Sequence, residues 1–181
     1  MRLVLGCGNK RYSNSVNLDS EKVVHPNIVA NINEKFPFKD NTFSEIICEQ
    51  ILEHTENIFF TMDEIHRVAK PNAVIKITVP YFSSELSYVN PQHGKHFFGW
   101  NTFDFWTPNY PQNYITKSRF LIVKKRFIWI SMFEESKIFR VLNNFVNFIL
   151  TLTSLSPYIY QKFFCWILPV DNIYFEMVVL K

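Results

Sequence analysis

The chain has 181 residues and a formal net charge of +3, and 48% of its residues are hydrophobic, with 19 phenylalanines among them. This composition is typical of a globular domain with its own core and excludes a disordered chain. The charge excess is small and no arginine-rich run is present, so the sequence gives no reason to expect a nucleic-acid partner.

The cysteine spacing and the N-terminal sequence indicate the cellular compartment in which the protein is expected. Cys7, Cys48 and Cys165 match the spacing of neither a disulfide framework nor a zinc site. No apolar run reaches the length of about 20 residues that a membrane-spanning helix needs. Strand-like sequence starts almost at Met1, where a signal peptide would lie. We therefore expect a protein of the cytoplasm.

Short apolar runs predict five strands in the first 80 residues. They are Arg2–Leu5, Val16–Leu18, Ile28–Ile32, Glu45–Cys48 and Ala73–Val79. The last run, AVIKITV, is β-branched and nearly continuous, which is typical of a strand buried on both faces of a parallel sheet.

A helix is predicted between the last two of these strands, in the segment ENIFFTMDEIHRVAK. One apolar face at helical spacing is formed by Ile58, Met62, Ile65 and Ala69. We expect Thr55 to cap the first turn and Pro71 to end the helix. Strands that alternate with helical pattern indicate an α/β domain.

The second half of the chain has a different pattern. Residues 81–118 are rich in aromatics, Asn, Pro and His, and predict long loops with a short helix near Thr102–Trp106. RFLIVKKRFIWI and NIYFEMVVLK predict two further strands. Between them lies a helical insert, residues 131–171, whose first helix is mostly apolar. The narrow polar stripe of that helix comprises Arg140, Asn144, Asn147 and Thr151.

The first predicted strand runs into a glycine turn in LVLGCGNK, which suggests a cofactor. A nicotinamide fingerprint requires a third glycine, where this chain has Arg11. It also requires an acidic residue about 20 residues further on, whereas Asp19 follows Gly8 by only 11 residues. No Gly-Lys-Ser/Thr follows the turn, so a Walker loop is excluded. Both nucleotide alternatives are therefore disfavoured.

Four segments in order carry a family resemblance: LVLGCGNK, VNLDS, IVANINEKFPFKDNTFSEIICEQILEH and EIHRVAKPNAVIKITVP. Together they resemble a class I S-adenosylmethionine-dependent methyltransferase, in particular the small type 11 group that acts on metabolites and glycans. The resemblance covers about residues 2–106. It implies a Rossmann-like α/β fold and S-adenosylmethionine as the cofactor. We expect one domain, 1–181, with a cofactor-binding half (1–80), substrate loops (81–118), a mostly parallel sheet and an antiparallel C-terminal strand pair.

The resemblance also implies a set of cofactor-binding residues: Gly6, Cys7, Gly8, Asp19, Ser20, Asn31, Ile32, Glu49 and Gln50. Gly6 and Gly8 permit close approach of the backbone to the methionine part of the cofactor. The Asp19 carboxylate can accept from both ribose hydroxyls; the alternative is an ordinary turn aspartate. Asn31 stands where the family has an acidic residue facing the adenine amino group.

Three histidines are candidates for a general base: His93, His96 and His54. His93 and His96 lie in NPQHGKHFF, after the fifth strand, where substrate loops of this fold gather. His54 follows the fourth strand and serves equally well as a wall of the cleft. No cluster with convincing metal-ligand spacing is seen in the sequence.

The expected reaction is methyl transfer to oxygen or nitrogen of a small molecule, glycan or lipid-linked acceptor. The segment 137–168 is either a helical pair packed over the sheet, a hydrophobic lid or a peripheral membrane contact. A non-catalytic module that binds S-adenosylmethionine or another protein is the alternative function. The oligomeric state stays open.

Overall fold

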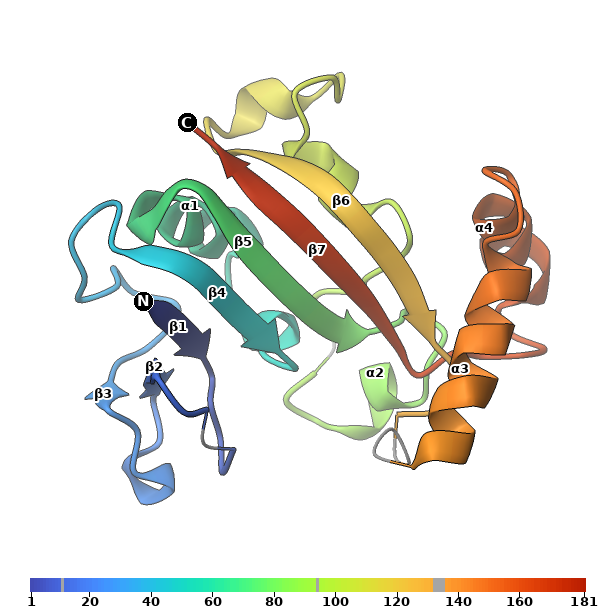
Figure 1. Ribbon diagram of the computed structural model, residues 1–181, viewed down its shortest axis with the longest axis horizontal. Coiled ribbons are helices and arrows are strands. Elements are labelled where there is room, and N and C mark those ends of the chain that lie inside the picture. Colours follow the sequence, from blue (N-terminus) through green and yellow to red (C-terminus); the bar gives the residue numbers. More distant parts are fainter. Residues whose placement is uncertain (11, 94, 132–135) are drawn as a thin grey trace.

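The computed structural model describes residues 1–10, 12–93, 95–131 and 136–181. The strands are β1 (Arg2–Leu5), β2 (Ser15–Asp19), β3 (Ile28–Val29), β4 (Phe43–Glu49), β5 (Ala69–Pro80), β6 (Arg119–Ile128) and β7 (Asn172–Leu180). They form one sheet in the order β3-β2-β1-β4-β5-β7-β6 (Figure 1). Neighbours from β3 to β5 are parallel, and β7 lies antiparallel to both β5 and β6. The predicted α/β class, with an antiparallel C-terminal pair, is confirmed.

Helix α1 (Ile58–Val68) follows β4, as predicted, but its ends differ from the expected ones. The Asn57 side chain accepts from the backbone N–H of Phe59 and Phe60 and caps the first turn. The Thr55 hydroxyl instead donates to the Leu52 carbonyl one turn earlier, so the expected Thr55 cap was wrong. Asparagine and threonine are both good caps, and only the three-dimensional path of the chain decides between them.

The boundary between α1 and β5 also differs, because the helix stops at Val68 and Pro71 already lies within β5. Pro71 therefore does not end the helix. Asn72 follows with a φ of +62°, which asparagine tolerates better than most residues. β3 contains only two of the five residues predicted for it. Its extension stops because the Asn31 side chain accepts from the backbone N–H of Asn33 and turns the chain.

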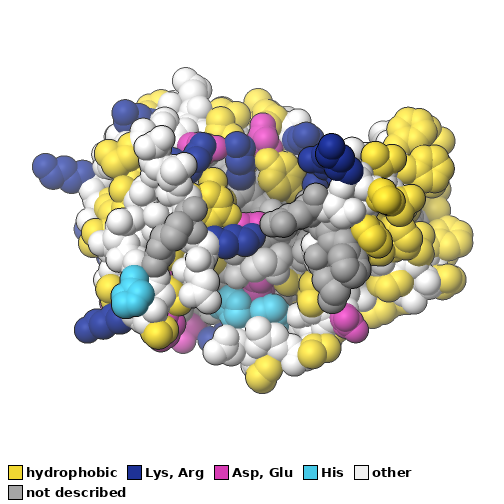
Figure 2. Space-filling view, turned by 60° about the horizontal axis from the view of Figure 1, so that its bottom comes forward, with side chains coloured by type: hydrophobic (Ala, Val, Ile, Leu, Met, Phe, Trp, Pro, Cys, Tyr) yellow, Lys and Arg dark blue, Asp and Glu magenta, His cyan; other side chains and the backbone are white. Residues whose placement is uncertain are grey.

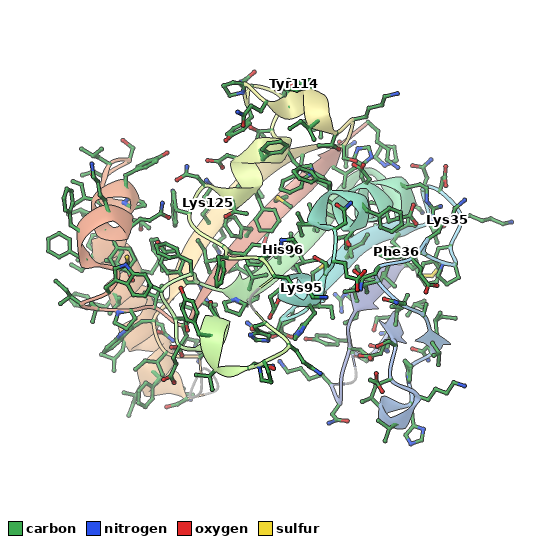
Figure 3. The ribbon with its side chains drawn as sticks, turned by 180° about the vertical axis from the view of Figure 1, so that it is seen from behind. Lys35, Phe36, Lys95, His96, Tyr114 and Lys125 are labelled. Carbon is green, nitrogen blue, oxygen red and sulfur yellow. The ribbon has the colours of Figure 1, made fainter. Side chains whose placement is uncertain are left out.

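Only one face of the sheet is covered by helices (Figure 1 and Figure 3). On the other face Glu45 accepts from Arg2 at 2.6 Å and from Lys76 at 2.7 Å across three neighbouring strands. Lys76 belongs to AVIKITV, whose alternate residues are half-exposed. The prediction that this strand is buried on both faces was wrong, because its charged residue stays near water with an ionic partner.

The loops after β5 pack onto the covered face. They include the helical turns α2 (Leu86–Val89), η3 (Thr102–Trp106) and η4 (Asn113–Ile115), of which only the second was predicted. Phe103 is fully buried, and its ring centroid lies 4.8 Å from that of Phe175 in β7. Large aromatic side chains thus give this irregular segment the burial that a helix layer supplies elsewhere.

The helical insert connects β6 to β7. It contains α3 (Lys137–Leu150), α4 (Ser156–Ile159) and the π-helical turn η5 (Tyr160–Phe164). The insert lies beyond the β6 edge of the sheet rather than over its face (Figure 1). Short helical turns η1 (Lys22–Val24) and η2 (Leu52–His54) complete the elements. None of the helices in the described ranges has both the length and the apolar content to cross a bilayer.

An ionic cluster joins the segment FPFKDNTF to α1. Arg67 donates to both carboxylate oxygens of Glu64 at 2.7 Å and to the carbonyls of Phe36 and Phe38. Glu64 in turn accepts from the backbone N–H of Phe36 at 2.7 Å. Arg67 also pairs with Asp40. The cluster thus satisfies backbone groups of a loop that enters β4, and it fixes α1 against the sheet.

We expect Arg67→Met to lower the free energy of unfolding by about 2–4 kcal/mol, because Glu64 is left nearly buried without its partner. Arg140→Met, which removes an exposed arginine from α3, is the matched control and should change stability by less than about 0.5 kcal/mol. Urea unfolding followed by circular dichroism measures both. Equal losses in the two variants would contradict this account.

Candidate functional site

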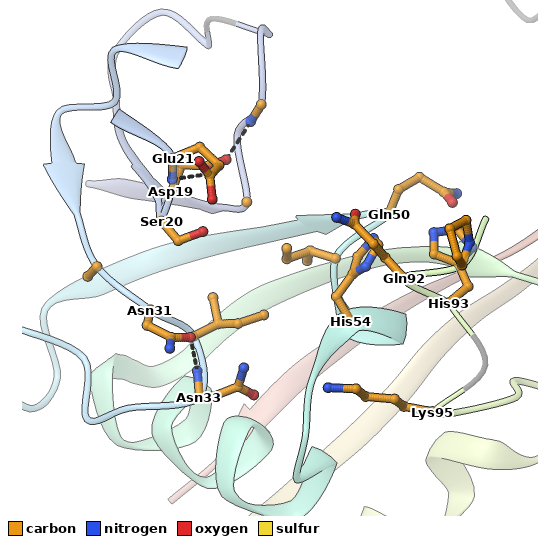
Figure 4. A pocket seen from close by; sticks show the side chains of 16 residues that line it. Asp19, Ser20, Glu21, Asn31, Asn33, Gln50, His54, Gln92, His93 and Lys95 are labelled. Carbon is orange, nitrogen blue, oxygen red and sulfur yellow. Dashed lines mark hydrogen bonds between the residues drawn. The ribbon is translucent and has the colours of Figure 1, made fainter. Parts of the chain in front are cut away.

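A cavity of about 730 Å³ opens at the carboxyl ends of β1, β2 and β4. Its walls are Gly6, Gly8, Asp19, Ser20, Glu21, Ala30, Asn31, Ile32, Asn33, Gln50, Ile51, His54, Pro91, Gln92, His93 and Lys95. Asp19 and Asn31 lie on one side of it, and His54 and His93 on the other (Figure 4). The volume is in the range of about 300–1,000 Å³ that is usual for cofactor and ligand sites.

The glycine turn forms one wall. Gly6 and Gly8 have positive φ angles of +61° and +51°, which glycine adopts without steric cost. A Cβ atom on Gly6 would lie 2.3 Å from Cδ1 of Ile51, so packing excludes a side chain there. A Cβ atom on Gly8 would meet no atom within 4 Å. Gly6 is thus required by the protein itself, while Gly8 leaves open space for a ligand.

Asp19 holds the turn in place. Its Oδ2 accepts from the backbone N–H of Gly8 at 2.8 Å, and its Oδ1 accepts from the backbone N–H of Glu21 at 3.0 Å. A carboxylate offers about four acceptor sites, so each oxygen keeps capacity for one hydroxyl of a ligand. The predicted ribose contact is compatible with this geometry, and Asp19 has a structural role as well.

Asn31, Ile32 and Ser20 follow β3 and β2 at the cavity wall. The side-chain oxygen of Asn31 accepts from the backbone N–H of Asn33. This hydrogen bond fixes the orientation of the Asn31 side-chain amide at the cavity wall. Ile32 is nearly buried and supplies apolar surface, and Ser20 is exposed. The tertiary structure therefore brings all three predicted residues to the cavity, although Asn31 also serves the local turn.

Glu49 and Cys7 lie behind the main cavity. They line a smaller neighbouring cavity of about 270 Å³. The Glu49 carboxylate accepts from Lys10 at 3.0 Å and from the Tyr12 hydroxyl. Glu49 thus binds the glycine loop rather than facing the main cavity. Gln50 lines both cavities.

Gln50 has a φ of +53°, a strained backbone conformation for a residue with a side chain. Its backbone N–H donates to the Thr78 carbonyl, and its side-chain Nε2 donates to Asn172 Oδ1 at 2.9 Å. These bonds from β5 and β7 hold the residue in place. Strain of this kind gathers where a chain approaches a ligand closely.

The three predicted histidines separate into two groups. His54 and His93 line the cavity and their ring centroids lie 4.6 Å apart, edge to face. His96 lines neither of the two cavities (Figure 3). Its Nε2 is buried and has no hydrogen-bond partner among the described residues. The structure therefore brings His93 and His54 together at the cavity and leaves His96 outside it.

A carboxyl group that sequence reasoning missed stands behind the histidines. Glu53 is only 1% exposed, and neither of its carboxyl oxygens has a hydrogen-bond partner in the described parts of the chain. Its Oε1 lies 3.9 Å from Nε2 of His93. Burial raises the pKa of Glu53 to about 7. The available signal was a glutamate directly before His54, after the apolar pair Ile51 and Leu52.

The ring of His93 is oriented by the backbone. Its Nδ1 lies 2.6 Å from the Leu86 carbonyl, to which only a protonated nitrogen can donate. This leaves Nε2 as the acceptor nitrogen, which lies 3.2 Å from Nδ2 of Asn90. Desolvation, together with the charge of His93, lowers the pKa of His54. The lowered pKa favours the neutral form of the His54 ring.

Glu53, His54 and His93 also form a group that a metal ion could use, since their ligand atoms lie within 4.8 Å of one another. The spacing in the sequence does not predict this group, because α1 and β5 separate residue 54 from residue 93. The observed Glu53–His93 separation of 3.9 Å exceeds what ligands at about 2.0–2.2 Å from one ion usually show. The same separation is also longer than a hydrogen bond, so Glu53 can act on His93 through its charge.

Comparison with known proteins identifies the fold. Residues 3–77 match the family model described as a methyltransferase domain. Over these residues the chain is similar to a methyltransferase domain, and its fold is that of S-adenosylmethionine-dependent methyltransferases. A methyltransferase from Archaeoglobus fulgidus, 16% identical, aligns over 98% of this chain and 85% of its own with a TM-score of 0.60. One from Mesorhizobium loti, 9% identical, aligns over 98% and 89% with the same score. The comparison with curated proteins gives no match.

One structural neighbour has been solved in complex with S-adenosylmethionine. The Haemonchus contortus phosphoethanolamine N-methyltransferase 2, solved in complex with it, is 14% identical and aligns over 99% of this chain and 48% of its own, with a TM-score of 0.60. The residues present here fit the cofactor, because Gly8 faces open space and Asp19 keeps free acceptor capacity. The cavity volume is also suitable.

The buried Glu53 carboxyl predicts a pH dependence of stability. Its pKa is higher in the folded chain, about 7, than the ordinary 4.5, so between these values only the folded state holds the proton. Stability therefore falls as the pH rises through this window, by on the order of 3 kcal/mol. Glu53→Gln removes the effect, so its stability relative to the original chain rises from about pH 4.5 to about pH 8.

Urea unfolding at a series of pH values measures this difference, and Glu34→Gln, an exposed glutamate, is the control. The lowered pKa values of His54 and His96 give a slope of opposite sign, which cancels when the variant is subtracted from the original chain. A difference profile that stays flat would show that Glu53 titrates normally in the folded chain.

Proposed function

We propose that the domain transfers the methyl group of S-adenosylmethionine to oxygen or nitrogen of a small molecule, glycan or lipid-linked acceptor. The observation that carries this proposal is the pair of cavity histidines with an unpartnered carboxyl behind them. In this proposal residues 1–80 bind the cofactor and loops from 81–118 bind the acceptor, within one domain. His93 then stands where the two meet.

The cofactor-binding roles follow from the positions of the side chains. Asp19 accepts from the ribose hydroxyls with the lone pairs that Gly8 and Glu21 leave free. The amide of Asn31 faces the adenine amino group from the same side of the cavity (Figure 4). The open backbone at Gly8 and the strained turn at Gln50 receive the methionine part.

When bound, the cofactor supplies a methyl group already activated by a positively charged sulfur. The protein must then orient the acceptor, exclude water and remove a proton. We assign proton removal to Nε2 of His93, because its Nδ1 is engaged by the Leu86 carbonyl. The acceptor's hydroxyl or amine takes the place of Asn90 at this nitrogen.

Glu53 and His54 support this base without touching the acceptor. The Glu53 carboxyl, 3.9 Å from Nε2 of His93, stabilises the imidazolium that forms when the proton arrives. His54 packs edge to face against His93 and fixes the plane of its ring. Its lowered pKa keeps it neutral, which avoids repulsion of a cationic sulfur in the same cavity.

The cofactor site is tested by calorimetric titration of S-adenosylhomocysteine. We expect the original chain to bind it and Asp19→Asn to lose about 1–3 kcal/mol of binding free energy, because a ribose hydroxyl loses its charged acceptor. The asparagine oxygen still accepts from Gly8, so the turn keeps one of its bonds. Glu34→Gln, outside the cavity, should bind as the original chain does. If the original chain itself does not bind, the proposed function fails.

The base is tested by turnover with methyl-labelled S-adenosylmethionine and a panel of glycosides, glycolipids and primary amines. His93→Gln should lower the rate at least about a hundredfold, the usual contribution of a general base. It should leave S-adenosylhomocysteine binding within about threefold, since the base is not a cofactor ligand. His96→Gln, outside the cavity, is the control and should retain the rate of the original chain.

Three other outcomes decide among the alternatives. Loss of turnover in His96→Gln with retention in His93→Gln would assign the base to His96. Loss of turnover on treatment with a chelator, restored by one added metal, would make Glu53, His54 and His93 metal ligands. Tight cofactor binding with no turnover on any acceptor would support a non-catalytic binding module.

A further inference from the structure

The helical insert turns its apolar side outward. Fifteen of the 26 exposed large hydrophobic residues in the described chain lie between Ile138 and Leu168, so they gather in one place instead of scattering. Figure 2 shows this hydrophobic surface at the end of the molecule that carries α3 and α4. We call it the apolar surface. It comprises Ile138, Val141, Leu142, Phe145, Phe148, Ile149, Leu152, Leu155, Tyr158, Ile159, Phe163, Phe164, Trp166, Ile167 and Leu168.

Two asparagines of α3 face the protein, while Arg140 and Asn144 of the predicted polar stripe are exposed. Asn143 is buried, and its side chain accepts from the backbone N–H of Ile130 and donates to the Ile130 carbonyl. Asn147 Oδ1 accepts from the backbone N–H of Phe127 at 2.9 Å. These two asparagines bind the end of β6, the edge strand of the sheet. A surface helix in a water-soluble domain normally has the opposite orientation, with its apolar stripe inward.

The second half of the insert is arranged in the same way. Gln161 points inward, where its Oε1 accepts from Trp100 N–H and the Tyr81 hydroxyl. Tyr160 is buried against Phe127 and donates to the Leu168 carbonyl. The neighbouring large apolar side chains point away from the domain. Hydrogen bonds to the domain thus fix the orientation of the insert, and the outward apolar side is part of the fold.

The charged residues within the helices that carry this surface all have one sign. Between residues 136 and 170 the sequence contains Lys137, Arg140 and Lys162 and no aspartate or glutamate. All three cations are exposed. Figure 2 also shows Lys and Arg side chains beside the apolar surface. A second copy bound symmetrically through this surface would bring Lys137, Arg140 and Lys162 near the same cations of its partner. An anionic lipid surface instead complements them.

The composition fits a lipid interface. Tyr158, Phe163, Phe164 and Trp166 are exposed aromatics of the kind that settle at the boundary between headgroups and hydrocarbon. An apolar groove of about 300 Å³ between α3 and α4 has Ser156 and Tyr160 as the only polar residues in its wall. No described helix can span a bilayer, so insertion is limited to the interface.

We infer that the apolar surface docks the protein on a membrane containing anionic lipids, with α3 lying in the plane of the interface. The insert enters and leaves the sheet at Ile128 and Asn172, which pair with each other at the edge where the cofactor cavity opens. Asn172 accepts from Gln50 of the cavity wall at 2.9 Å. The insert that carries the apolar surface thus joins the sheet at the same edge at which the cavity opens.

Vesicle flotation of the full chain tests this inference. We expect the chain to float with vesicles of phosphatidylcholine and phosphatidylglycerol, and less with phosphatidylcholine alone. Phe145→Glu and Trp166→Glu should each weaken binding about tenfold or more, because an exposed aromatic no longer enters the apolar phase. Both side chains are more than half exposed, so the fold is retained. Val23→Glu and Tyr114→Glu, equally exposed but distant in sequence, are the matched controls and should bind normally.

A second measurement keeps the result independent of folding yield. The fluorescence of Trp166 should shift to shorter wavelength on addition of anionic vesicles, and Trp166→Phe should lose this shift. The inference is overturned if the chain floats with neither vesicle, or if Phe145→Glu binds as well as the original chain. It is also overturned if light scattering shows a lipid-free dimer that Phe145→Glu converts to monomer. Cofactor binding is measured separately, so failure here leaves the proposed methyl transfer untouched.

Discussion

The carboxylate of Asp19 is the contact on which the site depends. It ties the end of β2 to the glycine turn after β1 through the backbone N–H of Gly8, and it turns the chain at Glu21. Two neighbouring parallel strands are thereby held at one register where they meet the cavity. Gly6 in the same turn has a positive φ, and the side chain of Ile51 leaves no room for a Cβ atom at this position. These two constraints act on the short connection between β1 and β2 and give this wall of the cavity its shape.

The opposite wall of the cavity depends on a buried carboxyl group. The structure keeps Glu53 in a nearly dry position without a partner, which is unfavourable for an ionised carboxylate. The pKa rises accordingly, and the group becomes responsive to a charge that forms next to it on His93. A surface glutamate would be screened by water and would have little effect on a neighbouring imidazole. Burial thus allows the charge of Glu53 to act strongly on His93.

The helical insert packs at the edge strand β6 and rejoins the sheet at a residue that contacts the cavity wall. Asn143 and Asn147 cover the end of the edge strand β6, which would otherwise present unpaired backbone groups to solvent. Because Asn143 and Asn147 of α3 face inward for this purpose, most large apolar side chains of the helix face outward. The same choice that protects the sheet edge therefore creates the apolar surface. Asn172, where the insert rejoins the sheet, connects this region to the cavity through Gln50.

The sequence by itself determined the order of the elements, the glycine turn and most residues at the cavity wall, because these depend on local periodicity and on motifs of adjacent residues. It could not choose between Thr55 and Asn57 as the helix cap, nor show that Lys76 faces solvent. Only the tertiary structure brought Glu53 to His93 and separated His96 from the cavity. It also decided which side of α3 faces inward. These features arise from contacts between segments far apart in the chain, and such contacts leave no period or spacing in the sequence that could reveal them.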